Sequence, residues 1–321
     1  MSINNLSRPG LKHFPFRRPR FVLISVTVLA VLAADAEPSI PDCRDRGVCD
    51  SAVRNFVCEE SSAWHCGATR YNLGEEGSVK ICVFIILATL FCLAAQAAEI
   101  HDAVKAGNLV KVQTLLQTNP ALVKAVSNDG KTPLHYAALA GNKAVCEMLI
   151  SGGADVHAKD KDNWTPLHCA ALKGQTEIAR LLLLRGADIH ALDNTGAEPL
   201  FWAVERDRPA LVRLLLDKGA NVSAHRNDGK TPLHCAAGGT YLSIATVLLD
   251  RGADLRAVDN VQQTPLHIAA LHNQKGMVQL LLARGANVNP RDKTGRTPLK
   301  LALGRNNKDV VQYLKLHGGQ E

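Results

Sequence analysis

A repeat of 33 residues organises the chain after residue 98. The heptapeptide TPLHYAA begins at Thr132, and five related blocks follow it in the same register without a slip. The six blocks begin at Thr132, Thr165, Glu198, Thr231, Thr264 and Thr297. A glycine keeps the same interval at Gly153, Gly186, Gly219, Gly252, Gly285 and Gly318. Units of this length cover their apolar sides only against neighbours, so the period predicts a stack of units rather than one globular core.

Each unit reads as two helices separated by turns. The threonine that begins a block can cap a helix, because its hydroxyl accepts a hydrogen bond from a free backbone N–H. Proline follows at the first helical position, where its fixed φ suits a helix and its missing N–H is not needed. Gly141 and Gly174 tolerate positive φ and are expected to end this helix. Later copies have Asp207, Thr240, Asn273 and Asn306 there. A leucine-rich second helix follows, as at 177–184, and turn formers such as those at 128–130 lead to the next block.

The block T-P-L-H-x-A-A, followed by a leucine-rich helix and G-A-D/N, resembles the ankyrin repeat. The resemblance covers residues 98–317 and includes a degenerate first copy, IHDAVKAGNLVKVQTLL, from Ile100. It implies an all-α fold, an ankyrin-repeat α-solenoid of paired antiparallel helices joined by hairpin-like turns. We expect seven units, at 98–130, 131–163, 164–196, 197–229, 230–262, 263–295 and 296–321. The last has Lys300 where His is usual, and its second helix should expose Lys308, Gln312 and Lys315 as an end face.

Histidine recurs at the fourth position of the block. The resemblance implies a structural role, in which the imidazole bonds to the block's threonine and to neighbouring backbone. The residues concerned are Thr132, His135, Thr165, His168, Thr231, His234, Thr264 and His267, with His101 equivalent in the first copy. Stacked helices lie roughly 8–10 Å apart, too far for two such histidines to share a metal ion with bonds of about 2.1 Å. We therefore expect no metal site and no cofactor.

No copy breaks the period to gather the polar groups that catalysis requires. Asp160 and Asp162 are paired carboxylates in a turn, and we interpret them as solvated. Cys146, Cys169 and Cys235 occupy apolar helix positions in different repeats and are expected to be buried free thiols. The sequence thus predicts no catalytic residue and no enzymatic activity.

The remaining candidate function is recognition of a protein partner. The resemblance implies that partners meet the turn tips and the exposed end of the first helix. The corresponding positions are Lys131, Leu139, Trp164, Leu172, Lys173, Glu205, Arg206, Lys230, Gln263, Leu271, His272 and Arg296. Trp164 is the strongest candidate anchor, because Trp and Arg dominate interface energetics. Its alternative role is to fold onto the adjacent turn and cover backbone. If Trp164 is the anchor, Trp164→Ala should weaken partner binding and leave the melting temperature nearly unchanged.

The fourth unit departs most from the pattern. Glu198 replaces the capping threonine and Phe201 replaces the histidine, so the Thr–His bond cannot form. Either this is a weakened seam, or Phe201 and Trp202 fill the space with apolar packing. Restoring both motif residues, by Glu198→Thr with Phe201→His, is expected to raise stability by about 0.5–2 kcal/mol.

The charge distribution argues against nucleic acid as a partner. The chain has 37 basic and 30 acidic residues, a net charge of +7. From Ala98 onward 27 basic and 21 acidic residues remain, without a run of five or six like charges. A nucleic-acid-binding domain should show a basic stripe, and none is evident. We expect an unidentified protein partner, no nucleic acid, and a monomer.

Residues 1–97 differ from the repeats. Residues 1–78 form an irregular segment with an apolar run at 21–34, and a second run, 81–97, follows Lys80. A lone cation, an apolar stretch and a small-x-small end are typical of a secretory signal peptide, here residues 79–97. In this interpretation Val79 is the initiator, residues 1–78 are spurious upstream translation, and the repeats are exported, periplasmic or extracellular, after cleavage behind Ala97.

A second interpretation takes both apolar runs as membrane segments. The arginines at 17–20 would then stay in the cytoplasm, and the repeats would return there as a membrane-tethered adaptor. The first run has 14 residues, which is short for a span of about 20. Between the runs, Cys43, Cys49, Cys58 and Cys66 fit no zinc pattern and could form disulfides outside the cell. The two interpretations place the repeats on opposite sides of a membrane, and the sequence leaves both open.

Overall fold

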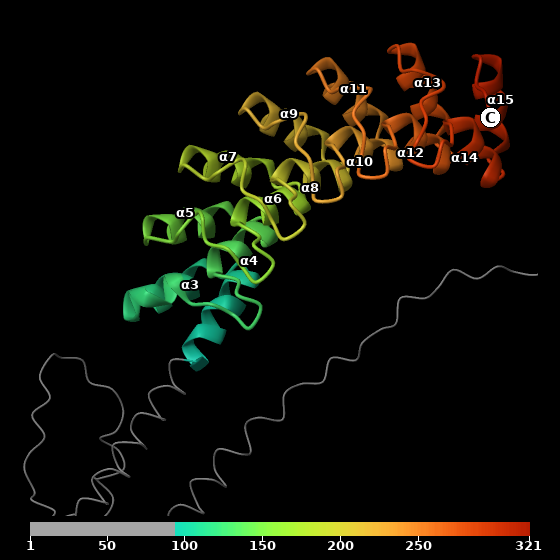
Figure 1. Ribbon diagram of the computed structural model, residues 1–321. Helices are drawn as coiled ribbons and strands as arrows, with labels where there is room; N and C mark the ends of the chain where they lie inside the picture. Colours follow the sequence, from blue (N-terminus) through green and yellow to red (C-terminus); the bar gives the residue numbers. More distant parts are fainter. Residues whose placement is uncertain (1–93) are drawn as a thin grey trace, which may run out of the picture. The chain divides into compact units, whose positions relative to one another are not determined.

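The computed structural model describes residues 94–321, which form a row of helix pairs joined by turns (Figure 1). The regular secondary structure of these residues is entirely helical, which confirms the predicted all-α solenoid. The apolar run 21–34, the four clustered cysteines and most of the run 81–97 lie outside the described residues. Within residues 94–321, no helix combines the length and apolarity that a bilayer crossing requires.

Seven helix pairs make up the described part. The first joins a helix over residues 94–105 to α3 (Leu109–Thr118), followed by the short 3-10 helix η2 (Pro120–Lys124). Each later pair has an inner helix, which begins in the repeated block, and an outer helix. The inner helices are α4 (Pro133–Ala140), α6 (Pro166–Lys173), α8 (Pro199–Glu205), α10 (Pro232–Gly238), α12 (Pro265–Leu271) and α14 (Pro298–Gly304). The outer helices are α5 (Lys143–Ser151), α7 (Thr176–Leu184), α9 (Pro209–Asp217), α11 (Leu242–Asp250), α13 (Lys275–Ala283) and α15 (Lys308–Leu316).

Inner helices pack on inner helices and outer helices on outer helices, as the two rows in Figure 1 show. Leu134, Ala137 and Ala138 of α4 are fully buried, and their equivalents in the later inner helices are buried too, apart from the exposed Leu303 in the last unit. Alanine at two of these positions leaves room for the neighbouring helix to approach closely. The core therefore runs continuously along the stack, each unit covering the apolar side of the next.

The ends of the inner helices follow the predicted turn chemistry with one exception. Gly141 (φ 82°) and Gly174 (φ 75°) take the left-handed conformation, and Asp207, Asn273 and Asn306 take it in later units. Thr240 is not among the residues with positive φ, consistent with the strain that this region imposes on a β-branched side chain. Unit five therefore turns differently, and the ring of Tyr241 lies where a side chain on Gly239 would sit.

The two ends of the repeat domain differ from the internal units. The described part of the first helix covers residues 94–105, so it crosses the expected boundary between Ala97 and Ala98. Gln96 accepts a hydrogen bond from the Asn119 amide at 3.1 Å, which ties this segment to the first unit. At the other end, Lys300 is exposed, and α15 exposes Lys308, Gln312 and Lys315, the expected end face.

Candidate binding surface

A histidine in each regular unit bridges two successive units. The Nδ1 of His135 accepts the backbone N–H of Thr132 at 3.1 Å, and its Nε2 lies 2.9 Å from the carbonyl oxygen of Trp164, 29 residues later. His168, His234 and His267 repeat this geometry, reaching the carbonyls of Ala197, Gln263 and Arg296. The structural role that the resemblance implied is therefore seen in each of these four copies.

The bonds of His135 also define its protonation. Because Nδ1 accepts from an N–H, it carries no proton, and because a carbonyl can only accept, the ring proton lies on Nε2. Burial lowers the pKa of His135 from its ordinary value of 6.5, and the same holds for His168, His234 and His267. Both ring nitrogens are committed to backbone, so neither is left to coordinate a metal.

Four turns are organised by a buried aspartate, and here the interpretation of Asp160 as solvated is wrong. Asp160 is 6% exposed, and its Oδ1 accepts from the backbone N–H groups of Asp162 and Trp164. Its Oδ2 lies 2.9 Å from the Lys131 ammonium. Asp193, Asp259 and Asp292 occupy the same position in later turns and hold the same two backbone N–H groups. The series keeps the 33-residue register, with Arg226 in place of aspartate in one turn, so the period that located the helices could also have located it.

Neighbouring turns are joined by hydrogen bonds along the stack. The backbone N–H of Asn227 donates to the carbonyl of Thr195 at 2.9 Å, and equivalent bonds join the other successive turns from Asp129 to Lys293. The amides of Asn194, Asn227 and Asn260 add side-chain bonds to the carbonyl of the preceding turn at 2.9–3.1 Å. These asparagines also recur every 33 residues and were missed at the sequence level. The turns therefore form one connected, preorganised edge.

The predicted tip residues lie on the returning arm of each turn rather than at its apex. The apex is formed two to three residues earlier, as at 194–195 and 227–228. Gly196 and Gly229 follow these apices, take positive φ and lie against the asparagine of the next turn. Lys131 and Lys230 are half-buried and Arg296 is exposed, and all three pair with acidic side chains. Gln263 is only 8% exposed, which leaves it little surface to offer a partner.

The aromatic side chains of units two to four gather where the inner helices meet the turns. Trp164 is half-buried, and its ring centroid lies 4.5 Å from that of Trp202 and 6.1 Å from that of His168. The Trp202 Nε1 donates to Asp193 Oδ2 at 2.9 Å, and the Tyr136 hydroxyl donates to Asp129 at 3.1 Å. These bonds hold the rings between helix and turn. We call Tyr136, Trp164 and Trp202, with the helix-end residues Leu139 and Leu172, the helix–turn surface.

The remaining helix-end candidates vary in exposure. Lys173, Arg206 and His272 are exposed, and Leu271 is half-buried. Glu205 is half-buried and bonded to the Arg226 guanidinium, which also pairs with Asp228 at 3.0 Å. Glu205 is therefore part of an internal ion network and less available to a partner than Arg206.

Unit four is packed with apolar side chains. Phe201 is fully buried beside Ala197 and Ala224, so the aromatic-packing alternative describes this site better than a weakened seam. Glu198 is 6% exposed, and its Oε1 lies 3.2 Å from His190 Nδ1, while its Oε2 has no hydrogen-bond partner in the described part of the chain. Burial raises the pKa of Glu198, and the His190 contact opposes this only in part.

The cysteines of the repeats are unreactive in this setting. Cys146 and Cys169 are fully buried, and Cys235 is half-buried. Burial raises the pKa of each thiol to about 12, so the nucleophilic thiolate is scarcely populated at neutral pH. This supports the expectation of free, structural thiols.

Comparison with known proteins gives a family match along the whole repeat domain. A family model described as ankyrin repeats (3 copies) matches residues 100–193, 183–259 and 255–321. Two fowlpox virus (strain NVSL) proteins are similar over shorter stretches. Putative ankyrin repeat protein FPV240 is 38% identical over 58 residues, 18% of this chain and 14% of its own length. Putative ankyrin repeat protein FPV223 is 38% identical over 52 residues, 16% of this chain and 36% of its own length. The matched segments thus span about a third or less of these relatives.

Proposed function

The chain belongs to the ankyrin-repeat family, and we propose that it is a non-catalytic scaffold that binds a protein partner through its helix–turn surface. Ankyrin repeats form protein–protein interaction domains that are generally non-catalytic, and family membership indicates the activity at this general level. The surface used, the partner and the location in the cell belong to the proposal.

The half-buried aromatic cluster is the observation that carries this proposal. Trp164 and Trp202 are half-buried, so part of each side chain is accessible. The ring of His168 lies near that of Trp164, and Asp193 accepts a hydrogen bond from Trp202. Large, rigid aromatic side chains supply contact area at low entropic cost and are common at the centres of interfaces. Leu139 and Leu172 add half-buried apolar side chains at the C-terminal ends of α4 and α6. The cluster has the composition of an interface centre.

Preorganisation supports the same assignment. The hydrogen bonds between successive turns and the histidine bridges between units hold the backbone in place in the absence of a partner. Binding therefore orders little of the scaffold, which lowers the entropic cost of association. A rigid edge with aromatic anchors suits recognition of a folded or extended polypeptide.

Site-specific photo-crosslinking tests the surface. A photoreactive amino acid is placed at position 172 or 206 on the inner side, or at 180 or 213 on exposed faces of outer helices. In extracts of cells that express the protein, we expect one competable adduct from 172 and 206 and none from 180 and 213. Adducts from the outer positions alone would move the interface to the opposite face and reject this proposal.

Export of the repeat domain is the second part of the proposal, with tethering to a membrane through residues 21–34 and 81–97 as its alternative. Cleavage behind Ala97 would remove residues 94–97 of the first helix together with the Gln96–Asn119 bond. Amino-terminal sequencing of the mature protein separates the two. A start at Ala98 supports export, and retention of residues 1–97 in a membrane fraction supports tethering.

A further inference from the structure

The net positive charge of the repeat domain lies in residues 256–321, the end of the fifth unit and the last two units. Residues 98–255 contain 17 basic and 17 acidic residues, whereas residues 256–321 contain 10 basic and 4 acidic residues. Two of those acidic side chains, Asp259 and Asp292, are buried in their turns and bonded to backbone N–H groups. The exposed surface of residues 256–321 is thus more cationic than the count indicates.

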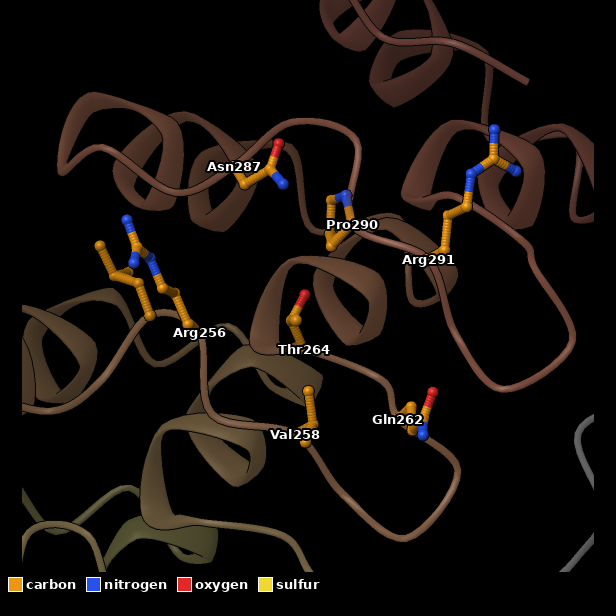
Figure 2. Close-up of a pocket in the computed structure, with 8 residues that line it drawn as sticks. Arg256, Val258, Gln262, Thr264, Asn287, Pro290 and Arg291 are labelled. Carbon is orange, nitrogen blue, oxygen red and sulfur yellow. The ribbon is translucent and has the colours of Figure 1, made fainter.

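A surface depression of about 390 Å³ lies in this cationic region, between the linker that precedes α12 and the linker that precedes α14 (Figure 2). Figure 2 shows Arg256 and Arg291 at opposite ends, with Thr264 between them. Val258 and Pro290 contribute apolar lining. The depression therefore has two cationic ends and a partly apolar middle.

The lining offers hydrogen-bond donors and no carboxylate. The Arg291 Nη1 donates to the Gly295 carbonyl at 2.9 Å, which orients the guanidinium and leaves its other N–H groups to a ligand. The Asn287 Oδ1 accepts the backbone N–H of Asn289 at 3.0 Å, so its amide NH₂ remains a donor. Among the described residues, neither Arg256 nor Arg291 forms an ion pair with an acidic side chain.

The preceding repeat shows that the fold does not require these residues. At the positions 33 residues earlier, Ser223, Val258 and Asp254 stand in place of Arg256, Arg291 and Asn287. All three differences change the depression from neutral or acidic to cationic or donor-rich. Structural repetition alone does not account for the two arginines that line this depression.

We propose that this depression binds an acidic segment of the partner polypeptide, with one carboxylate at each arginine and an apolar side chain over Val258 and Pro290. The guanidinium fork matches a carboxylate in two parallel hydrogen bonds. Two cations at opposite ends fit a chain that carries spaced carboxylates better than one compact anion such as phosphate. The inference rests on the proposed function and adds the chemistry of the partner.

Fluorescence anisotropy on the full chain tests this site. The probe is a fluorescein-labelled peptide of sequence GEELEEG, compared with its glutamine counterpart GQQLQQG and with inorganic phosphate as competitor. We expect the acidic peptide to bind at least about tenfold more tightly than the glutamine peptide, since charge-assisted bonds are roughly twice as strong as neutral ones. Arg256→Ser with Arg291→Val should weaken binding by a similar factor, and both replacements already occur at these positions in the preceding repeat.

A matched control removes the same charge elsewhere. Lys275 and Lys315 are exposed and lie outside the depression, so Lys275→Gln with Lys315→Gln should change affinity less than about twofold beyond general screening. Equal losses in both double variants, no binding by the native chain, or stoichiometric displacement by phosphate would each overturn the proposal. If the peptide does not bind but crosslinking from position 172 succeeds, only the acidic-segment proposal is rejected. If crosslinking from position 172 fails while the acidic peptide still binds, only the proposed helix–turn surface is rejected.

Discussion

The Nε2 of His168 lies 3.1 Å from the carbonyl oxygen of Ala197, the residue just before the next unit's block. The same ring accepts the N–H of Thr165 at 3.1 Å, so one side chain both caps its own helix and holds the neighbouring unit. Stability along the stack therefore depends on neutral histidines at repeated positions. In unit four, Phe201 replaces this histidine, and its fully buried ring fills the position with apolar packing.

Replacing His168 with the residue that unit four uses should separate packing from hydrogen bonding. His168→Phe keeps a ring but leaves the Thr165 N–H without a partner and removes one of the two hydrogen bonds that the Ala197 carbonyl accepts, the other coming from the Asp193 N–H. We expect a loss of about 1–3 kcal/mol in the free energy of unfolding, the cost of unsatisfied buried polar groups. Urea unfolding followed by circular dichroism measures it. Wild-type stability in this variant would mean that the bridge contributes nothing.

The stack should lose stability in mild acid. Burial lowers the pKa of the four bridging histidines below 6.5, so the unfolded chain takes up protons first as the pH falls. Their stabilisation is complete above pH 6.5 and declines below it, by about 1.4 kcal/mol per pH unit for each histidine that remains neutral in the fold. Denaturation midpoints between pH 7.5 and 5.5 test this, and a flat profile would show that the rings can be charged without unfolding.

Glu198 should be a site where the sequence can be improved. Glu198→Thr removes a buried carboxylate with one unpartnered oxygen and restores a capping hydroxyl, so we expect a gain of about 0.5–2 kcal/mol at pH 7. Since the pKa of Glu198 is raised from 4.5, the penalty exists above its folded pKa and disappears as the pH falls and the carboxyl becomes neutral. The gain should therefore shrink in acid, and a gain independent of pH would assign it to the cap alone.

Adding Phe201→His to that variant should not help. The phenyl ring is fully buried beside Ala197 and Ala224, with the Arg226 guanidinium 5.8 Å from its centroid. A histidine there would bring a polar ring beside a cation. We expect the double variant to be less stable than Glu198→Thr alone, which revises the joint gain expected from the sequence. Parallel thermal melts of the native protein, Glu198→Thr and the double variant decide between the two expectations.

Trp164 should contribute to stability as well as to binding. The sequence-based hypothesis of an unchanged melting temperature in Trp164→Ala is difficult to reconcile with a ring 4.5 Å from Trp202. Aromatic pairs contribute about 0.5–1.5 kcal/mol beyond the area they bury, so we expect a lower melting temperature together with weaker binding. Leu172→Ala offers a companion variant on the same surface with less packing to lose. Binding loss in both variants would identify the surface, and normal binding in both would exclude it.

The fold was predictable because one period carried caps, breakers and apolar positions in register from Thr132 to Thr297. The buried aspartates and the bonding asparagines shared that period, but an aspartate such as Asp160 usually faces water, so composition gave no reason to bury it, and the exposed Asn194 gave no sign of its bond to the preceding turn. The exposure of individual turn residues was harder to predict from the sequence. Gln263 and Lys131 occupy one repeat position, yet one is buried and the other half-buried, because exposure depends on the neighbouring turn.

Hydrogen–deuterium exchange of the full chain, free and with its captured partner, tests the central claim most directly. The account predicts slower exchange in the inner helices of units three and four and in the turns that precede them, residues 161–173 and 194–206, with outer helices α7 and α9 unchanged. Protection of α7 and α9 without change in those turns would contradict it.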